Sequence, residues 1–224
     1  MKIQEIRSYI DKLNRGKNKD TIFTRRIAKS VEVAKVWNTA RNNPQGYVGN
    51  FFFILNNEGE YVGAIYDMGW DLHWYIVPKH RGKGHLTKAL RKAILPHIFH
   101  IGRDEQKISI ELNAIGSKNY NSSKKVATSL GFIPIDGSDS EFVLKATEFD
   151  NSHDQRSECN SSITNERLEE IKDKIDQAYE LISSVRDELL LTYGEDIELT
   201  DLAHRARTYN YRIEDLMWKH RDLS

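Results

Sequence analysis

The sequence predicts an α/β (α+β) protein in which a mixed, mostly antiparallel sheet is flanked by helices and followed by an antiparallel αα-hairpin. Three observations lead to this prediction. Short β-rich runs follow one another through residues 20–77, with turn residues between them. A strand, a glycine-bearing loop and a helix then come in immediate succession between residues 71 and 100. Beyond residue 162, apolar residues recur at heptad spacing.

The elements of the first 146 residues can be assigned in chain order from the spacing of their apolar residues. The series Ile3, Ile6, Ile10 and Leu13 predicts a short amphipathic helix at the amino terminus. We expect strands over residues 20–26, 47–55, 61–68, 71–77, 107–113 and 141–145, and helices over residues 30–42, 85–100 and 122–130. Asn56-Asn57-Glu58-Gly59 is typical of a hairpin loop.

The last third of the chain changes in composition. Residues 147–162 contain one aromatic and no aliphatic residue, which is typical of a polar linker. Heptad stripes then run from Leu168 to Leu189 and from Leu202 to His220, and they predict two helices. Gly194 would end the first helix, and Thr200 would cap the second.

Neither of these helices can bury its stripe alone, so we expect an acidic hairpin over residues 163–224. The hairpin would pack on the first unit, pair with a second copy, or bind another protein. Interaction or dimerisation is the role that we favour.

Charge is divided unevenly along a chain whose formal net charge is zero. Residues 1–146 hold 23 Lys and Arg against 14 Asp and Glu, while residues 147–224 hold 10 against 19. The basic part favours an anionic ligand. The apolar runs are too short for a membrane helix, and the amino terminus lacks the apolar core of a signal peptide. With a single cysteine, Cys159, these features predict a cytoplasmic protein.

The loop after the predicted strand 71–77 is the most informative segment. It contains Gly82 and Gly84 and leads directly into a helix. Glycines let the backbone turn sharply and approach a ligand closely. The N–H groups and the positive end of the following helix then form a site suited to phosphate. The GxGxxG and GxxxxGK[ST] patterns of nucleotide loops are absent from this segment, which disfavours Rossmann and kinase folds.

Residues 77–84, Val-Pro-Lys-His-Arg-Gly-Lys-Gly, resemble the acyl-CoA pyrophosphate signature of the GNAT superfamily of N-acyltransferases. The resemblance covers residues 20–146 and continues in residues 119–123, Asn-Tyr-Asn-Ser-Ser, and in residues 130–132, Leu-Gly-Phe. It also includes the expected order of strand, helix, three strands, loop, helix, strand, helix and strand. Within the superfamily the chain is most similar to the ribosomal-protein N-terminal acetyltransferase branch.

This resemblance implies acetyl-CoA as cosubstrate and assigns residues to it. Backbone groups of Ile76 and Val77 would pair with the pantetheine amides, Thr87 would add a hydroxyl, and Asn119 would reach the pantetheine arm. The pyrophosphate would be surrounded by the N–H groups of Arg81, Gly82, Lys83, Gly84, His85 and Leu86.

Two positions depart from the family pattern. Leu86 stands where a small residue is usual. Ala127 stands where a tyrosine often protonates the departing thiolate.

Acyl transfer from a thioester to an amine needs a neutral amine, an oxyanion donor and a protonated leaving group. Candidates for the base are His73, which alternates with Asp71 and Tyr75 on one predicted strand, and Glu111 on the neighbouring strand. Candidates for the acid are the hydroxyl groups of Ser122, Ser123 and Tyr120. No metal is expected, because no third ligand accompanies the pair His97 and His100 at suitable spacing.

The sequence thus predicts an N-acetyltransferase that moves an acetyl group from acetyl-CoA to a primary amine of a protein or peptide by direct transfer. One alternative is a toxin-like aminoacyl-tRNA acetyltransferase, which the basic part permits, although its charge forms no dense cluster. Another is a catalytically weak acyl-CoA-binding module. It is supported by the two departures from the family pattern, Leu86 and Ala127.

Overall fold

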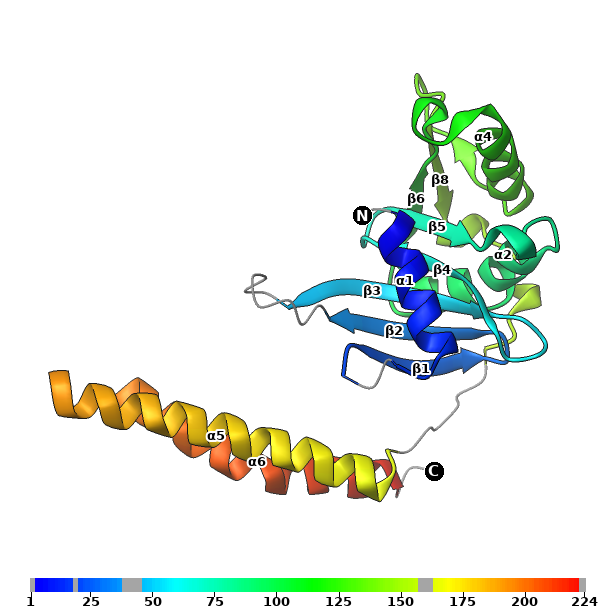
Figure 1. The fold of residues 1–224 in the computed structure, drawn as a ribbon. Helices are drawn as coiled ribbons and strands as arrows, with labels where there is room; N and C mark the ends of the chain where they lie inside the picture. The colour runs from blue at the N-terminus through cyan, green and yellow to red at the C-terminus, as the bar shows by residue number, and fades with distance from the viewer. Residues whose placement is uncertain (1–2, 18–19, 38–45, 157–162, 222–224) are drawn as a thin grey trace. The chain divides into compact units, whose positions relative to one another are not determined.

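The computed structural model describes residues 3–17, 20–37, 46–156 and 163–221. The chain divides into two compact units, Met1–Cys159 and Asn160–Ser224. The first unit contains a sheet with helices on both faces, and the second consists of two long helices (Figure 1). The predicted α+β class and the C-terminal αα-hairpin are therefore confirmed.

A five-stranded antiparallel sheet forms the centre of the first unit, and its strand order follows the chain. The strands are β1 Ile22–Ala28, β2 Val31–Trp37, β3 Tyr47–Leu55, β4 Tyr61–Asp67 and β5 Leu72–Ile76. Asn56 Oδ1 accepts the N–H groups of Glu58 and Glu60 at 3.0 and 2.9 Å, and Gly59 has a φ of 82°. The predicted hairpin between β3 and β4 is confirmed.

The helix predicted over residues 30–42 is wrong, because residues 31–37 form strand β2; residues 38–42 lie outside the described residues. β2 pairs with β1 on one side and with β3 on the other. Val31 packs in the core on one face of the sheet, and Ala34 and Val36 pack in the core on the other. A strand buried on both faces shows no single apolar stripe, so its spacing can be mistaken for that of a helix.

Helices cover both faces of this sheet (Figure 1). Helix α1, Ile3–Asn14, buries Ile6, Ile10 and Leu13 against Phe51 and Phe53 of β3, as its spacing predicts. The other face packs against one continuous helical stretch of α2 His85–Ala89, a π-helical turn Leu90–Ile94 and α3 Leu95–His100. This stretch agrees with the helix predicted over residues 85–100.

A smaller antiparallel sheet completes the first unit, in the order β6-β8-β7. Its strands are β6 Glu105–Ser109, β7 Ile133–Pro134 and β8 Glu141–Lys145, and α4 Leu112–Ser129 connects β6 to β7. β6 ends before the predicted residue 113. Leu112, which we expected inside the strand, is half exposed and begins α4. The helix contains a break at Gly116, whose φ is 75°, and it ends before Gly131 as predicted.

The first part of the predicted linker is not a linker. Residues 147–156 contain two 3-10 turns, Ala146–Glu148 and Asn151–His153. The N–H of Gln155 donates to the carbonyl of Lys92 at 2.8 Å, and the ring of Phe149 lies 5.4 Å from that of Phe99. The Phe149 ring and this main-chain bond thus attach the polar stretch to the rest of the first unit. Residues 157–162 lie outside the described residues.

The second unit is an antiparallel pair of helices, α5 Asn165–Tyr193 and α6 Ile197–Arg221. Gly194 ends α5 as predicted. Asp196 rather than Thr200 caps α6, because Asp196 Oδ1 accepts the N–H of Leu199 at 3.0 Å. None of the helices in the described part of the chain has the length and apolar character needed to cross a membrane.

Candidate functional site

The loop after β5 holds Gly82 and Gly84 in a conformation that other residues avoid. Their φ angles are 75° and 77°, in the left-handed region that glycine tolerates best. A Cβ at either position would meet no atom within 4 Å, so the requirement comes from the backbone angles and the space above the loop is open. Gly84 directly precedes α2, whose first N–H groups therefore point toward the loop.

Arg81 joins this loop to the end of β5. Its Nε donates to the carbonyl of Ile76 at 3.0 Å, and its guanidinium carbon lies 5.8 Å from the centre of the Tyr75 ring. Arg81 and Lys83 are both exposed. Two basic side chains therefore border an open loop that already presents main-chain N–H groups, an arrangement suited to an anion.

The first turn of α2 contributes the next three predicted residues, His85, Leu86 and Thr87, all half-buried. Leu86 packs against the core, so its bulk is accommodated beneath the helix. Burial lowers the pKa of His85, and the neighbouring positive charges of Lys83 and Lys88 lower it further. Both effects favour the uncharged imidazole beside the loop.

The hydrogen bonds of β5 decide which of its main-chain groups face away from β4. The N–H of Val77 donates to the carbonyl of Val62 at 2.9 Å. Because facing pairs alternate along an antiparallel ladder, the N–H and C=O groups of Trp74 and Ile76 point to the opposite edge. The N–H of Val77, which we expected to pair with a pantetheine amide, is thus already bound within the sheet. The main-chain groups of Trp74, to which we had assigned no role, face the open edge instead.

β5 and β6 run parallel and meet at one end only. Asp71 and Lys107 form an isolated parallel bridge, in which the N–H of Lys107 donates to the carbonyl of Trp70 at 3.2 Å. A continued ladder would direct the N–H of Ser109 to the carbonyl of Leu72. Instead, Asp71 Oδ1 accepts that N–H at 3.0 Å. β5 is the last strand of its sheet, so beyond the bridge no strand among the described residues neighbours its edge.

The carboxylate of Asp71 also contacts His73, the first of the proposed bases. Asp71 Oδ2 lies 3.1 Å from His73 Nε2, with Asp71 buried and the imidazole half exposed. Burial by itself would raise the pKa of Asp71, but the hydrogen bonds from His73 and from Ser109 outweigh it and lower that pKa. A carboxylate that holds one imidazole nitrogen fixes the orientation of the ring and leaves the other nitrogen for a reacting group.

Glu111, the second proposed base, is not on a strand beside His73. It is the N-cap residue of α4, its side chain is exposed, and β6 has ended at Ser109. The alternation of Ile108 and Ile110 continues to Leu112 in the sequence, but the chain turns before it. The expected arrangement of Glu111 on a strand adjacent to His73 is therefore wrong.

Two predicted residues on α4 use their polar groups within the helix. Asn119 donates its side-chain amide to the carbonyl of Ile115 at 2.8 Å. The hydroxyl of Ser122 donates to the carbonyl of Lys118 at 2.9 Å. Both side chains are exposed, and each hydrogen bond is local to α4, so the structure does not bring Asn119 or Ser122 into contact with β5.

Tyr120, Ser123 and Ala127 follow one another at helical spacing and share a face of α4. This face packs toward the sheet: Ala127 is fully buried, and Tyr120 is half-buried against the same core. The hydroxyl of Tyr120 donates to the carbonyl of Asp139 at 2.9 Å. Ser123 lies between the other two, and its Oγ accepts the indole N–H of Trp74 at 3.3 Å.

The structure therefore connects β5 to α4 through Trp74 and Ser123, a contact that links residues 49 positions apart. Ser123 was expected as a candidate acid, with no indication in the sequence that it lies beside Trp74. Asp71 was expected on the strand face with His73, but not as the acceptor for the N–H of Ser109. The sequence signal for that role is a carboxylate just before the strand.

Metal ligands do not gather at this site. Within the described ranges, no three side chains of His, Cys, Asp or Glu lie close enough together to hold a metal ion. His97, one of the pair considered in the sequence, packs its ring 5.8 Å from that of Phe52, and burial lowers its pKa.

Comparison with known proteins adds no family assignment: no protein-family model matches the chain, and no curated protein matches its sequence.

Proposed function

We propose that the first unit is an acyl-CoA-dependent N-acyltransferase of GNAT type that moves an acetyl group from acetyl-CoA to a primary amine of a protein or peptide. The observation that carries this proposal is the position of the left-handed loop of Gly82 and Gly84. The loop lies at the start of α2 and directly follows a strand whose outer edge parts from β6. An anion site next to an open strand edge suits a ligand with a pyrophosphate and an amide-bearing arm.

In this proposal the cofactor lies along β5. The N–H groups from Gly82 to Leu86 take the pyrophosphate, whereas the N–H of Arg81, which we expected to join them, already donates to the carbonyl of Pro78 at 3.2 Å. The N–H of Ile76 and the main-chain groups of Trp74 pair with the pantetheine amides. The Trp74 indole, now bonded to Ser123, borders the same edge, so its rotation would widen the space for the acyl chain.

The transfer requires one new bond and one broken bond. The amine nitrogen attacks the thioester carbonyl, a C–N bond forms, and the C–S bond breaks as the electron pair leaves with sulfur. His73, held by Asp71, takes the proton that the amine loses. The thiolate receives a proton from Ser123 or from water, since Ala127 offers no acidic group.

A catalytically weak acyl-CoA-binding module is the second candidate. It is favoured by the complete burial of Ala127 and by the engagement of the Tyr120 and Ser122 hydroxyls in other hydrogen bonds. Both candidates share the cofactor site and differ in turnover.

Binding and turnover are tested separately. We expect acetyl-CoA to raise the melting temperature of the full chain. An unchanged melting temperature at millimolar acetyl-CoA would contradict both the acyltransferase and the acyl-CoA-binding module. Thiol release is then followed with peptides, polyamines and charged tRNA as acceptors. We expect release with a peptide amine, and at least tenfold less from His73→Gln. Release with charged tRNA alone would favour the aminoacyl-tRNA alternative, and binding with no release would favour the module.

A further inference from the structure

The two helices of the second unit meet along a seam that differs from the stripe predicted for α6. Lys172 Nζ lies 2.5 Å from Glu214 Oε1, and the side-chain amide of Asn210 donates to Asp176 Oδ1 at 2.7 Å. The guanidinium carbon of Arg207 lies 6.0 Å from the centre of the Tyr179 ring. These pairs place position 172 opposite 214 and position 176 opposite 210. The α6 residues turned toward α5 are consequently Ala203, Ala206, Asn210, Ile213 and Met217, all buried or half-buried.

Half of the predicted α6 stripe is left out of this seam. Leu202, Tyr209 and Leu216 each stand one position before a seam residue, and they are 50%, 45% and 55% exposed. They recur every seven residues over nearly the full length of α6. α5 shows the same pattern, because Ile171, Ala178 and Val185 stand one position before Lys172, Tyr179 and Arg186 at the same spacing.

The two displaced stripes lie on the same side of the hairpin. Each heptad has two seam positions, a and d, and the residue before a is position g. In an antiparallel pair the g positions of both helices lie on the same side of the seam, and the e positions lie on the other. Leu181, 69% exposed, lies one turn from Ala178 and Val185 and extends this surface. We name the set Ile171, Ala178, Leu181, Val185, Leu202, Tyr209 and Leu216 the apolar face.

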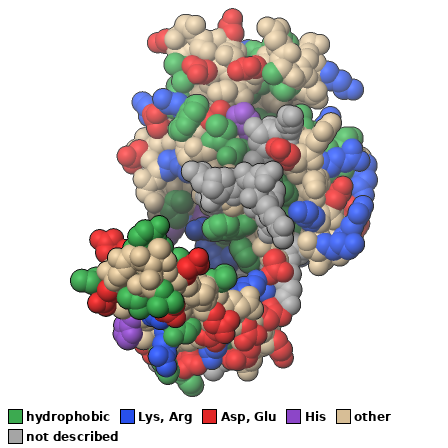
Figure 2. Space-filling view, turned by 60° about the vertical axis from the view of Figure 1, so that its left-hand side comes forward, with side chains coloured by type: hydrophobic (Ala, Val, Ile, Leu, Met, Phe, Trp, Pro, Cys, Tyr) green, Lys and Arg blue, Asp and Glu red, His purple; other side chains and the backbone are tan. Residues whose placement is uncertain are grey.

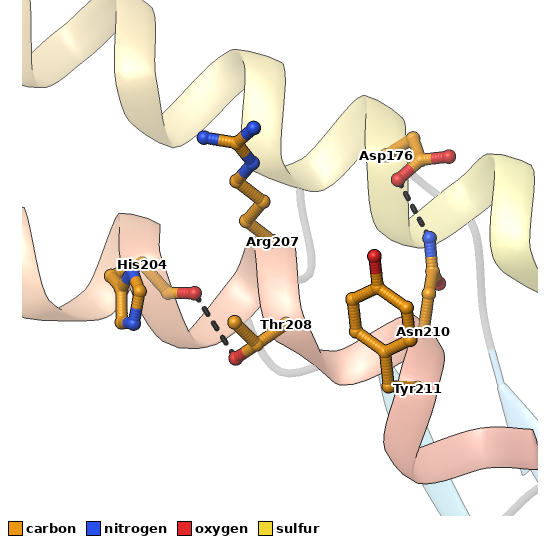
Figure 3. A pocket seen from close by; sticks show the side chains of 6 residues that line it. All are labelled: Asp176, His204, Arg207, Thr208, Asn210 and Tyr211. Atoms are coloured by element: carbon orange, nitrogen blue, oxygen red, sulfur yellow. Dashed lines mark hydrogen bonds between the residues drawn. The ribbon is translucent and has the colours of Figure 1, made fainter.

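The opposite side of the hairpin carries the polar contacts between the helices, together with the exposed rings of Tyr211 and Trp218. Asp176, Arg207 and Glu214, which make the contacts described above, all lie there. Figure 3 shows the residues that line a hollow on this side, His204 and Tyr211 among them, with Asn210 bonded to Asp176 across the seam. The polar contacts between the two helices thus lie on one side, and the stripe of Leu202, Tyr209 and Leu216 lies on the other. In Figure 2, apolar side chains are visible among acidic ones on the surface of the helical unit.

We propose that the apolar face binds a second copy of this chain, so that two hairpins form a four-helix bundle. A slab of two helices with a heptad stripe from each is half of such a bundle, and a second slab of the same kind supplies matching stripes of the same length. Taking roughly 180 Å² for a fully exposed large apolar residue, the exposed fractions of Leu181, Val185, Leu202, Tyr209 and Leu216 give about 480 Å² per copy, or about 960 Å² for two. That total is close to the roughly 1,000 Å² expected of a specific interface.

The association is tested on the full chain by sedimentation equilibrium at about 1 to 100 μM, a range that spans typical homodimer affinities. The expected mass at the upper end is twice the 26.0 kDa of one chain. The double substitution Tyr209→Glu with Leu216→Glu is expected to reduce it to that of one chain. Circular dichroism checks that the helical content of the variant is retained.

Tyr211→Glu with Trp218→Glu is the matched control, because both residues lie on α6 with the same spacing of seven but on the other side. They are 73% and 61% exposed, and this variant is expected to remain a dimer. A wild-type monomer throughout the range would overturn the proposal, as would an equal response of the two double variants.

A second measurement does not depend on introducing charges. In a Cys159→Ser background, Ala178→Cys should give a covalent dimer with a short bismaleimide, and the exposed Glu180→Cys should give at least fivefold less. Equal yields from the two would also contradict the proposal. Neither measurement involves acyl-CoA, so the outcome is independent of the proposed activity.

Discussion

At the scale of single residues, Asp71 determines how β5 and β6 part. Its buried carboxylate takes the amide of Ser109, which a regular ladder would have given to a main-chain carbonyl, and it also holds His73. Buried N–H groups must find an acceptor. A side-chain acceptor meets that requirement while the two strands separate, so one residue both ends the pairing and orients the proposed base.

Replacing Asp71 by Asn tests this double role. We expect the free energy of unfolding at pH 7 to fall by about 1–3 kcal/mol, because an amide cannot accept both hydrogen bonds as well as a carboxylate does. The pKa of Asp71 is lowered in the folded protein, so its contribution is present above the unfolded value of about 3.9 and is lost as pH falls through the folded pKa.

The measurement is urea unfolding from pH 7 to pH 2.5. Wild-type stability should decline more steeply below about pH 4 than that of Asp71→Asn. Asp136→Asn, at an exposed carboxylate, serves as the control, and it should follow the wild type throughout. Identical acid profiles for Asp71→Asn and the wild type would contradict the role assigned to this carboxylate.

Gly84 allows a similar test of the loop. Gly84→Ala should lower stability by about 1–2 kcal/mol, since alanine is strained at a φ of 77°. It should also weaken acetyl-CoA binding measured by calorimetry, because relief of that strain displaces the N–H groups at the start of α2. Gly69→Ala is the matched control: its φ is 87° with the same open space. It should cost similar stability and leave acetyl-CoA affinity unchanged.

At the scale of elements, the five-stranded sheet is stable because helices cover both of its faces. α1 packs on one face and the stretch from α2 to α3 on the other. Phe51 and Phe53 of β3 lie under α1, both fully buried and stacked 5.8 Å apart. β3 is the central strand of the five, and its side chains pack in the cores on both faces of the sheet.

Phe53→Ala should therefore destabilise the first unit by about 3–5 kcal/mol, the usual cost of removing a buried aromatic side chain. Thermal or urea unfolding of the full chain measures this loss. Phe23→Ala on strand β1, where the side chain is 43% exposed, should cost less than about 1 kcal/mol. A similar loss for both substitutions would mean that β3 does not form the core described above.

At the scale of the whole molecule, the chain combines a basic unit and an acidic one. The excess of Lys and Arg belongs to residues 1–146, where the glycine loop lies. A summed positive potential attracts an anionic ligand from a distance as well as at contact. This long-range attraction is screened by salt, while a hydrophobic contact is not weakened in this way.

Salt should accordingly reduce the affinity for acetyl-CoA. Between about 0.1 M and 1 M sodium chloride, the Debye length falls from about 10 Å to about 3 Å, and we expect the Kd to rise roughly three- to tenfold. Calorimetry at a series of salt concentrations measures this. The control ligand is S-acetylpantetheine, which has no phosphate, and its binding should change little. A salt-independent Kd for acetyl-CoA would argue against the glycine loop as a phosphate site.

Much of the fold could be predicted from local patterns. The single-faced helix α1, the hairpin at Asn56 and the cap at Gly194 follow from spacing and turn chemistry. β2 could not be recognised, because Val31 and Val36 are buried on opposite faces and no one-sided stripe marks the strand. The site shows the same division: Gly82 and Gly84 are local signals, whereas the contact of Trp74 with Ser123 depends on how α4 packs.

The sequence by itself determined the elements whose partners are near in the chain, and with them the glycine loop that carries the functional proposal. Only the tertiary structure decided which groups meet across distance. It placed Asp71 between two strands, ended β6 before Glu111, and turned Leu202, Tyr209 and Leu216 outward from the seam between α5 and α6. The reason is physical: a periodic pattern specifies that a face is apolar, but packing chooses which of two adjacent stripes faces the partner helix.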